Sequence, residues 1–208
     1  MTAQWHWVYH ITDIKNLTSI IATPGLVSDA RMQGFASTVI GHGHIKARRL
    51  TEYRVGCFNP APFVGEFVPF YYCPRSVMLY TINKGGVDGL PAGSQRTVLH
   101  LVTRTDVLMN LGRDWAISDG NAGAAHTSFY NDVSGFQQLS WDAINSRHWP
   151  GLTHQKCAEF LVRDHVPWTA ISHIGCFDED VAAQVNQLFD ALAVAHRPQV
   201  QVVKGWYY

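Results

Sequence analysis

A single carboxylate within an apolar run is the residue of this sequence best suited to catalysis. Glu159 lies within residues 156–162, which read Lys-Cys-Ala-Glu-Phe-Leu-Val, a composition that predicts a β-strand. Burial of an unpaired carboxylate is costly. Two interpretations therefore stand side by side: Glu159 faces solvent on the outer side of a strand, or a rigid strand holds it as the acid of an active site.

Basic and imidazole groups occur at two further positions. His10 lies in an aromatic, β-branched stretch, where a buried imidazole needs hydrogen-bond partners, and the residue by itself is more typical of a core histidine than of a ligand contact. Arg48 and Arg49 belong to the densest basic cluster of the chain, together with Lys46 and Arg54. A basic run of this kind is typical of a solvated helix face, and the pattern alone favours that interpretation.

Aromatic side chains and an arginine form a third candidate site. Residues 67–76 combine phenylalanines and tyrosines with Arg75, which is bracketed by prolines and polar residues. This chemistry is suited to stacking on nucleic-acid bases or on nicotinamide. An aromatic core strand would give the same pattern, so composition alone leaves both interpretations open.

Familiar sequence signatures are missing from the chain. No GxGxxG follows a predicted strand, no GxxxxGK[ST] occurs, and neither GxSxG nor HExxH is present, so a Rossmann turn, a P-loop and the commonest hydrolase sites are unsupported. Residues 41–44, Gly-His-Gly-His, offer two imidazoles without a third ligand, and we expect no metal. The four cysteines contain no CxxC pair, and we expect them to be reduced in an intracellular protein.

Composition places the chain among globular proteins. Of 208 residues, 47% are hydrophobic and 15% are charged, which suffices for a core without disulfides or metals. Lys plus Arg and Asp plus Glu number 16 each, so a nucleic-acid site must come from local clustering. We expect no signal peptide and no membrane span. Without linkers or repeats, residues 1–208 are interpreted as one domain of a cytoplasmic protein.

Short strands, few helices and long loops must position these groups. Strands are predicted over residues 5–11, 66–73, 76–82, 97–102, 158–163, 171–177 and 200–203. Helices are predicted over residues 14–21 and 45–55, over a turn or two at 106–110, and from Asp178 to Leu192. Residues 28–43 and 118–135 are predicted to be loops. This pattern favours an α+β fold over a doubly wound one.

Several of these segments together resemble one protein family. They are residues 9–12 (Tyr-His-Ile-Thr) with Asn16 and Leu17, residues 66–80, residues 158–162 and the terminal Trp-Tyr-Tyr of 206–208. In type and order, and over nearly the whole chain, they resemble the DarT family. DarT proteins are toxins of bacterial toxin–antitoxin pairs. They attach ADP-ribose from NAD to a base of single-stranded DNA, which is thymidine in the best-known branch. The resemblance implies an ADP-ribosyltransferase fold with a split central β-sheet that binds NAD in a cleft.

The resemblance also implies roles for individual residues. Glu159 becomes the catalytic carboxylate, and Arg49, the second arginine of an Arg-Arg pair, serves both NAD and the acceptor base. Contacts to NAD are implied for His10, Thr12, Asn16, Leu17, Arg49, Tyr71 and Met78. Contacts to single-stranded DNA are expected for Arg75 and Arg48, and for Trp141 and Trp149 in the stretch before Glu159. A surface loop that packs its aromatics inward would carry the same tryptophans.

Partners and alternatives follow from the same resemblance. It implies NAD as co-substrate, no metal, and a cognate antitoxin with a macrodomain that removes the modification. Two departures bear on the choice of base: Val77 stands where relatives commonly have Pro, and Asn121 stands where some have His. The alternatives are transfer to another base such as guanine, to RNA or to protein, and a non-enzymatic single-strand-binding module, against which the intact Glu159 weighs.

Overall fold

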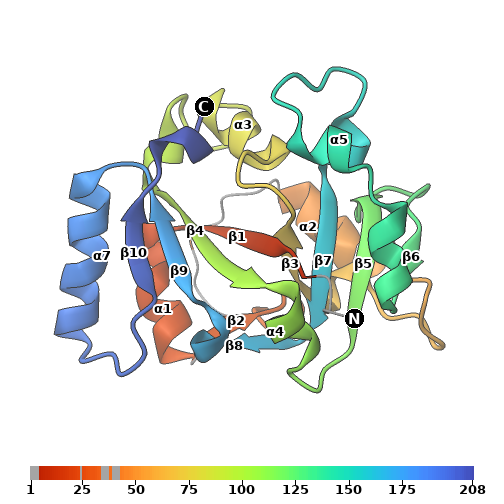
Figure 1. Ribbon diagram of the computed structural model, residues 1–208, viewed down its shortest axis with the longest axis horizontal. Helices are drawn as coiled ribbons and strands as arrows, with labels where there is room; N and C mark the ends of the chain where they lie inside the picture. Colours follow the sequence, from red (N-terminus) through yellow and green to blue (C-terminus); the bar gives the residue numbers. More distant parts are fainter. Residues whose placement is uncertain (1–4, 24, 34–37, 39–42) are drawn as a thin grey trace.

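A large β-sheet organises the chain. The computed structural model describes residues 5–23, 25–33, 38 and 43–208. Its eight-stranded sheet has the order β10-β9-β4-β1-β3-β7-β5-β6 (Figure 1). The strands are β1 (Trp7–Asp13), β3 (Phe67–Tyr71), β4 (Val98–Arg104), β5 (Trp115–Asn121), β6 (Phe129–Tyr130), β7 (Ala158–Arg163), β9 (His173–Cys176) and β10 (Gln199–Val202). A second, two-stranded sheet pairs β2 (Gly25–Val27) with β8 (His165–Pro167).

Mostly short helices surround the sheet. They are α1 (Leu17–Ala22), α2 (Gly43–Thr51), α3 (Val77–Asn83), α4 (Thr105–Met109), α5 (Trp141–Asn145), α6 (Thr153–Lys156) and α7 (Glu179–Ala191). The longest, α7, lies beside β10 at one edge of the molecule, whereas α3 and α5 lie at the same end of the sheet (Figure 1). Asp178 caps α7 by accepting a hydrogen bond from the Val181 amide at 3.0 Å, and Val181, Val185 and Phe189 are buried.

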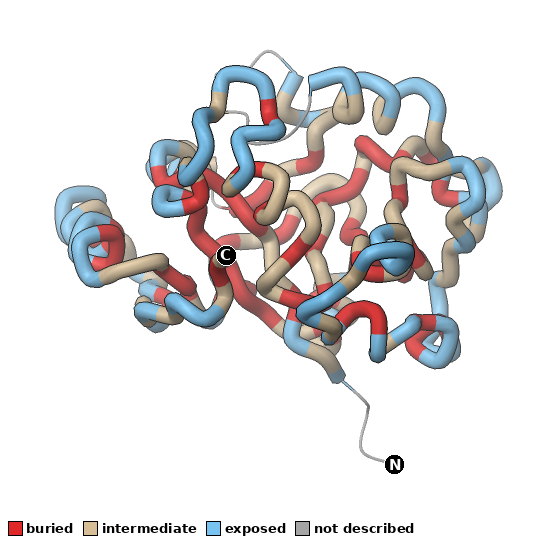
Figure 2. Tube along the Cα trace, turned by 90° about the horizontal axis from the view of Figure 1, so that it is seen from above, coloured by how far each residue is buried: buried red, intermediate tan, exposed pale blue. Residues whose placement is uncertain are grey.

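Strand register brings the middle of the sheet into a fixed arrangement. Antiparallel pairing places Tyr9 of β1 opposite Tyr71 of β3, and Tyr71 opposite Glu159 of β7. Residues 158–162 are all buried, because both faces of β7 are covered. Figure 2 shows buried segments running through the inside of the molecule and exposed segments mostly at its periphery. Side chains from segments far apart in sequence therefore meet on a rigid frame.

The sequence predictions of the regular elements are largely confirmed. The predicted strands near residues 5–11, 66–73, 97–102, 158–163, 171–177 and 200–203 correspond to β1, β3, β4, β7, β9 and β10, and the predicted helices to α1, α2, α4 and α7. The α+β class is confirmed by this mixed, mainly antiparallel sheet with helices around it. The four cysteines are free. No described helix is long and apolar enough to cross a membrane.

Two predictions of local structure are wrong. Residues 76–82, predicted as a strand, form α3, because Ser76 caps a helix by accepting a hydrogen bond from the Leu79 amide at 3.2 Å. Leu79 and Ile82, three positions apart, are then buried on one helical face. Residues 118–135, predicted as a loop, contain the end of β5, the short strand β6 and part of a 3₁₀ turn, where sheet pairing outweighs a composition rich in small residues.

Candidate active site

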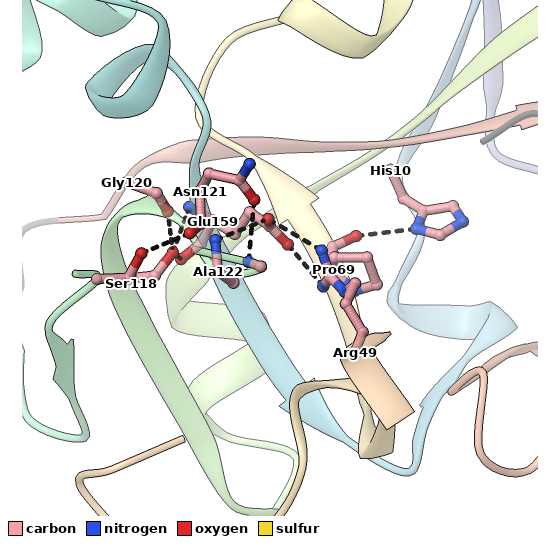
Figure 3. Close-up of polar contacts among 10 residues, drawn as sticks. His10, Arg49, Pro69, Ser118, Gly120, Asn121, Ala122 and Glu159 are labelled. Atoms are coloured by element: carbon pink, nitrogen blue, oxygen red, sulfur yellow. Dashed lines mark hydrogen bonds and ion pairs between the residues drawn. The ribbon is translucent and has the colours of Figure 1, made fainter. Parts of the chain in front are cut away.

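A buried ion pair forms the centre of the candidate site. The Arg49 guanidinium donates two hydrogen bonds to Glu159, from Nη1 to Oε1 at 3.1 Å and from Nη2 to Oε2 at 2.9 Å (Figure 3). The side chain of Glu159 is 2% exposed and that of Arg49 is 12% exposed. The solvent-facing interpretation of Glu159 is therefore wrong. Because both charges are shielded from water, each depends on the other for compensation.

The irregular end of β5 supports the carboxylate from the other side. The Ala122 amide donates to Glu159 Oε1 at 3.3 Å. Ser118 Oγ accepts a hydrogen bond from the Glu159 amide at 3.0 Å and donates to the Gly120 carbonyl at 2.7 Å (Figure 3). The pairing of β5 with β7 shifts register between residues 117 and 121, which lets the chain curve around the carboxylate. Sequence reasoning missed Ser118 and Ala122, because it placed both in a loop.

Gly120 allows a close approach at this bend. A side chain at residue 120 would collide with the His154 ring, whose Nε2 lies 2.1 Å from the position of an added Cβ. The His154 ring also lies 4.1 Å from that of His126, centroid to centroid. A larger residue at position 120 would therefore have to displace the His154 ring from its packing between α6 and β5.

The charge state of Arg49 is set by its partner. Burial acts to lower the pKa of the guanidinium, but the Glu159 carboxylate and its hydrogen bonds more than reverse this effect, so the pKa lies above its ordinary value. Arg49 therefore keeps its positive charge in the site.

A cavity of about 210 Å³ opens beside Arg49, whereas its partner Glu159 is not among the lining residues. Six of the residues predicted to contact NAD line it: His10, Thr12, Asn16, Arg49, Tyr71 and Met78. The seventh, Leu17, is fully buried in the hydrophobic core and is not among the lining residues. The cavity thus lies among β1, α1, β2, α2, β3 and α3, where several of the sequence motifs converge.

His10 presents one ring nitrogen to a fixed partner. Its Nδ1 lies 2.9 Å from the Pro69 carbonyl oxygen, which can only accept, so Nδ1 carries the hydrogen (Figure 3). Burial lowers the pKa of His10, which favours the neutral ring. In that tautomer Nε2 is a hydrogen-bond acceptor.

Hydrogen bonds and apolar groups shape the rest of the cavity. Asn16 Nδ2 donates to Thr12 Oγ1 at 3.1 Å and to the Thr38 carbonyl at 2.8 Å, and Asn16 Oδ1 accepts from the Thr38 amide at 2.7 Å. Lys46 pairs with Asp29 at 3.0 Å on the same wall, a pair that the sequence did not reveal. Burial, followed by the nearby Glu159, raises the pKa of Tyr71, so its phenol stays protonated.

Arg75 and Trp149, predicted to contact DNA, lie at the two ends of one aromatic cluster. The Arg75 guanidinium carbon lies 4.3 Å from the Tyr208 ring centroid. The Tyr208 and Tyr80 rings are 5.1 Å apart, and the Tyr80 and Trp149 rings are 5.3 Å apart. We name Arg75, Tyr80, Trp149 and Tyr208 the aromatic cluster. Sequence reasoning did not assign a DNA role to Tyr80 or Tyr208.

The other two residues predicted to contact DNA lie elsewhere. Arg48 is half exposed and pairs with Glu52 at 2.7 Å, as expected of a solvated helix face. Trp141 packs inward: its Nε1 donates to the Phe136 carbonyl at 3.1 Å, and its ring stacks on His6 with centroids 4.3 Å apart. The placement of Trp141 matches the inward-packed alternative rather than an exposed stacking surface.

The histidine-rich segment of the sequence can be followed only in part. Its residues 41 and 42 lie outside the described residues. In the described part of the chain, no group of three or more His, Cys, Asp or Glu side chains is arranged to hold a metal ion.

Comparison with known proteins agrees with this geometry. The family model of DarT, a single-stranded DNA thymidine ADP-ribosyltransferase, matches residues 9–208. The chain belongs to the DarT family. A DNA ADP-ribosyl transferase of Thermus aquaticus is 33% identical over 97% of this chain and 88% of its own length. One from Mycobacterium tuberculosis is 30% identical over 97% of this chain and 88% of its own length.

Solved DarT structures share the fold. The structure of Thermus sp. 2.9 DarT in complex with ADP-ribosylated single-stranded DNA matches with a TM-score of 0.90 and 32% identity, over 97% of this chain and 96% of that one. The same protein in complex with NAD⁺ matches with a TM-score of 0.83 and 30% identity, over 97% of both chains. The ADP-ribosyltransferase fold implied by the sequence resemblance is confirmed.

Proposed function

We propose that this DarT protein transfers ADP-ribose from NAD to the base of thymidine in single-stranded DNA and releases nicotinamide. The observation that carries the proposal is the Arg49–Glu159 pair, buried beside a cavity that His10 and Tyr71 line, in a chain of this family. The related Thermus protein is known in complex with NAD⁺ and with ADP-ribosylated single-stranded DNA. We further propose that residues 1–208 act as one domain.

The residues around the cavity fit the chemistry of NAD. His10 Nε2 can accept a hydrogen bond from a ribose hydroxyl, because Nδ1 is already engaged by Pro69. The Tyr71 ring and the Met78 side chain offer apolar surface for the nicotinamide. Arg49 brings positive charge to a ligand whose pyrophosphate is negative. When bound, NAD supplies the ADP-ribosyl group on a pyridinium ring, which leaves as neutral nicotinamide.

Glu159 acts on the ribose as the bond to nicotinamide breaks. Positive charge then builds on the ribose, and a carboxylate fixed nearby stabilises this state more than the ground state. The rigid β7 backbone, the Ala122 amide and Arg49 hold the carboxylate in one orientation before the reaction starts. Such preorganisation avoids the cost of turning dipoles during the reaction.

Arg49 is proposed to act on the acceptor as well. Thymine must lose its N3 proton to solvent water before or during attack on the ribose, and a guanidinium beside the base stabilises the negative charge that results. N3 lies on the Watson–Crick edge, which a duplex hides, so a single strand is the accessible substrate. Arg75 and Trp149 lie in a cluster suited to stacking on the neighbouring bases.

Mass spectrometry of a short oligonucleotide tests the proposal. We expect the wild type, given NAD and a single strand that contains thymidine, to add one ADP-ribosyl group, and Glu159→Gln to lower the rate by about 100-fold or more. Glu179→Gln, at an exposed position of α7, is the matched control and should keep full activity. No mass gain with the wild type, or equal gain with Glu159→Gln, would refute the assignment.

Changing the acceptor distinguishes the remaining alternatives. Oligonucleotides in which each base replaces thymidine in turn, a matching RNA strand and a mixture of proteins would be assayed under the same conditions. We expect transfer to the thymidine strand alone. Transfer to guanine, RNA or protein instead would keep the scaffold chemistry and overturn the proposed acceptor, whereas DNA binding without transfer would support a binding module.

Family membership extends the proposal to the cell. We propose that the protein acts as a toxin in the cytoplasm, where NAD and single-stranded DNA occur together, and that a macrodomain antitoxin reverses the modification. Co-expression with a macrodomain protein that removes ADP-ribose from DNA should restore growth to cells that express the wild type. Persistent toxicity, together with loss of the DNA modification, would contradict this role.

A further inference from the structure

A buried ammonium group lies three residues before Glu159. The side chain of Lys156, at the end of α6, is 3% exposed. Its Nζ donates to the carbonyl oxygens of Ile144 at 2.8 Å and Ser146 at 2.9 Å. A charged group is seldom buried without strong partners, so these contacts fix the ammonium group in one place.

These two hydrogen bonds fix the start of the connection between α5 and α6. Ile144 lies in the last turn of α5 and Ser146 directly follows that helix, where carbonyl groups lack the amide partners of a continuing helix. Residues 147–152 then connect α5 to α6, and α6 ends at Lys156 itself. Lys156 therefore joins both ends of this connection just before β7 begins at Ala158.

The same ammonium group also contacts the segment that follows β3, the strand that carries Tyr71. Lys156 Nζ lies 3.7 Å from Cys73 Sγ, and this thiol donates to the Arg75 carbonyl at 3.6 Å. Burial raises the pKa of Cys73 and Lys156 only partly opposes it, so the thiol keeps its proton. Cys73 follows β3, which carries Tyr71, and Arg75 is the first member of the aromatic cluster.

The contacts of Lys156 reach two segments, and each segment carries one end of the aromatic cluster. The hydrogen bond to the Ser146 carbonyl fixes the start of the connection that carries Trp149. The contact with the Cys73 thiol, which donates to the Arg75 carbonyl, fixes the turn that carries Arg75. Both ends meet at the rings of Tyr80 and Tyr208. Since Lys156 also precedes Glu159 on a continuous backbone, it links the proposed DNA-stacking surface to the catalytic carboxylate.

We propose that Lys156 is a positioning residue that sets where the acceptor strand lies relative to Glu159. The proposal rests on the proposed transfer to single-stranded DNA. Lys156 acts through the carbonyls and the thiol that it holds. A displacement of about 1 Å in the acceptor can cost about 100-fold in rate, because the attacking atom must be close and aligned. Loss of the ammonium group should therefore impair transfer while it spares the binding of NAD.

Lys156→Met tests this split. Methionine has a similar length and no charge, and Ser146, one of the two residues whose carbonyl oxygens it would leave, is only partly buried. We expect kcat/KM for the oligonucleotide to fall by about tenfold to 100-fold, while the Kd for NAD, measured by calorimetry, stays within about twofold. Amide hydrogen exchange should speed up at residues 146–152 and stay unchanged in β1 and β3. Lys204→Met, at an exposed position, is the control.

Conservative variants complete the experiment. Lys156→Arg restores a charged donor and should recover part of the transfer rate. If Lys156→Met fails to fold, Lys156→Gln, which keeps one donor group, takes its place in the same assays. Unchanged transfer, or NAD binding that weakens as much as transfer, would overturn the proposal. If the wild type itself modifies no DNA, the proposed function fails, and the hydrogen exchange still reports whether Lys156 holds residues 146–152.

Discussion

The NAD side and the acceptor side of the site are built differently. On the NAD side, His10, Tyr71 and Glu159 project from the neighbouring strands β1, β3 and β7, with Tyr9 opposite Tyr71 and Tyr71 opposite Glu159. On the acceptor side, Trp149 and Arg75 lie outside the strands and are positioned by ring contacts and by the carbonyls that Lys156 holds. Sheet pairing fixes the positions of the side chains on the NAD side, whereas a few side-chain contacts fix those on the acceptor side.

This difference predicts how each side responds to mutation. A strand residue keeps its place through backbone hydrogen bonds that a side-chain change does not remove. A residue in a short connection depends on individual side chains, so single changes should move it further. Outside the buried Arg49–Glu159 pair, substitutions on the NAD side should therefore alter binding with little change in structure, and those on the acceptor side should alter both.

Loss of Arg49 is expected to have the largest effect. Arg49→Met leaves Glu159 buried without its partner, and we expect the free energy of unfolding in urea to fall by about 3–5 kcal/mol. Transfer should fall by about 100-fold or more. The double variant Arg49→Met/Glu159→Leu should regain most of the stability and none of the activity. Arg113→Met, at an exposed position, is the control, and unchanged stability of Arg49→Met would contradict the buried pair.

Acid should lower the free energy of unfolding through His100, which contacts the residue before Arg75. His100 is fully buried, its Nε2 lies 2.9 Å from the Pro74 carbonyl, and burial lowers its pKa from 6.5 to about 4. The unfolded chain takes up the proton near pH 6.5 and the folded chain only near pH 4. The free energy of unfolding should therefore fall by about 3 kcal/mol as the pH drops across this window.

The variant His100→Gln isolates this effect from other acid-sensitive groups. The decline in unfolding free energy between pH 6.5 and pH 4, followed by urea titration, should be shallower than in the wild type by most of that amount. The exposed His148→Gln should behave like the wild type. Equal pH slopes for His100→Gln and the wild type would show that His100 titrates normally.

Trp141 separates a packing role from a binding role on the acceptor side. Its ring stacks on His6 and its indole nitrogen donates to the Phe136 carbonyl, so Trp141→Ala should lower the free energy of unfolding by about 3 kcal/mol. The KM for the oligonucleotide should change by less than about threefold at a temperature where the variant is folded. A large rise in this KM without loss of stability would return Trp141 to the DNA surface.

A pair of reciprocal variants gives the smallest but sharpest effect. Tyr71→Ala should raise the KM for NAD by about tenfold and leave that for DNA nearly unchanged, because its ring lines the cavity. Trp149→Ala should do the reverse, through the loss of one stacking surface. Steady-state kinetics with each substrate varied in turn measures both. Effects of equal size on both substrates would erase the distinction between the two sides.

Local patterns in the sequence determined much of the NAD side. The aromatic and β-branched runs around His10 and Tyr71 and the apolar run around Glu159 predicted their strands, and acids followed by an apolar stripe predicted α7. These signals depend on neighbours within a few residues, which is the range over which strand alternation and helix capping act. The family motifs lie on the same segments, and the family comparison confirmed the resemblance they carry.

Only the tertiary structure decided which charged and aromatic residues meet. Arg48 and Arg49 are neighbours in one basic run, and the fold buries only Arg49, against a carboxylate 110 residues away. It turned Trp141 inward and left Trp149 in the aromatic cluster. The physical reason is that burial and pairing depend on contacts distant in the chain, and no pattern of adjacent residues encodes them. Lys156, an ordinary lysine in the sequence, gains its significance from the carbonyls that the fold brings to it.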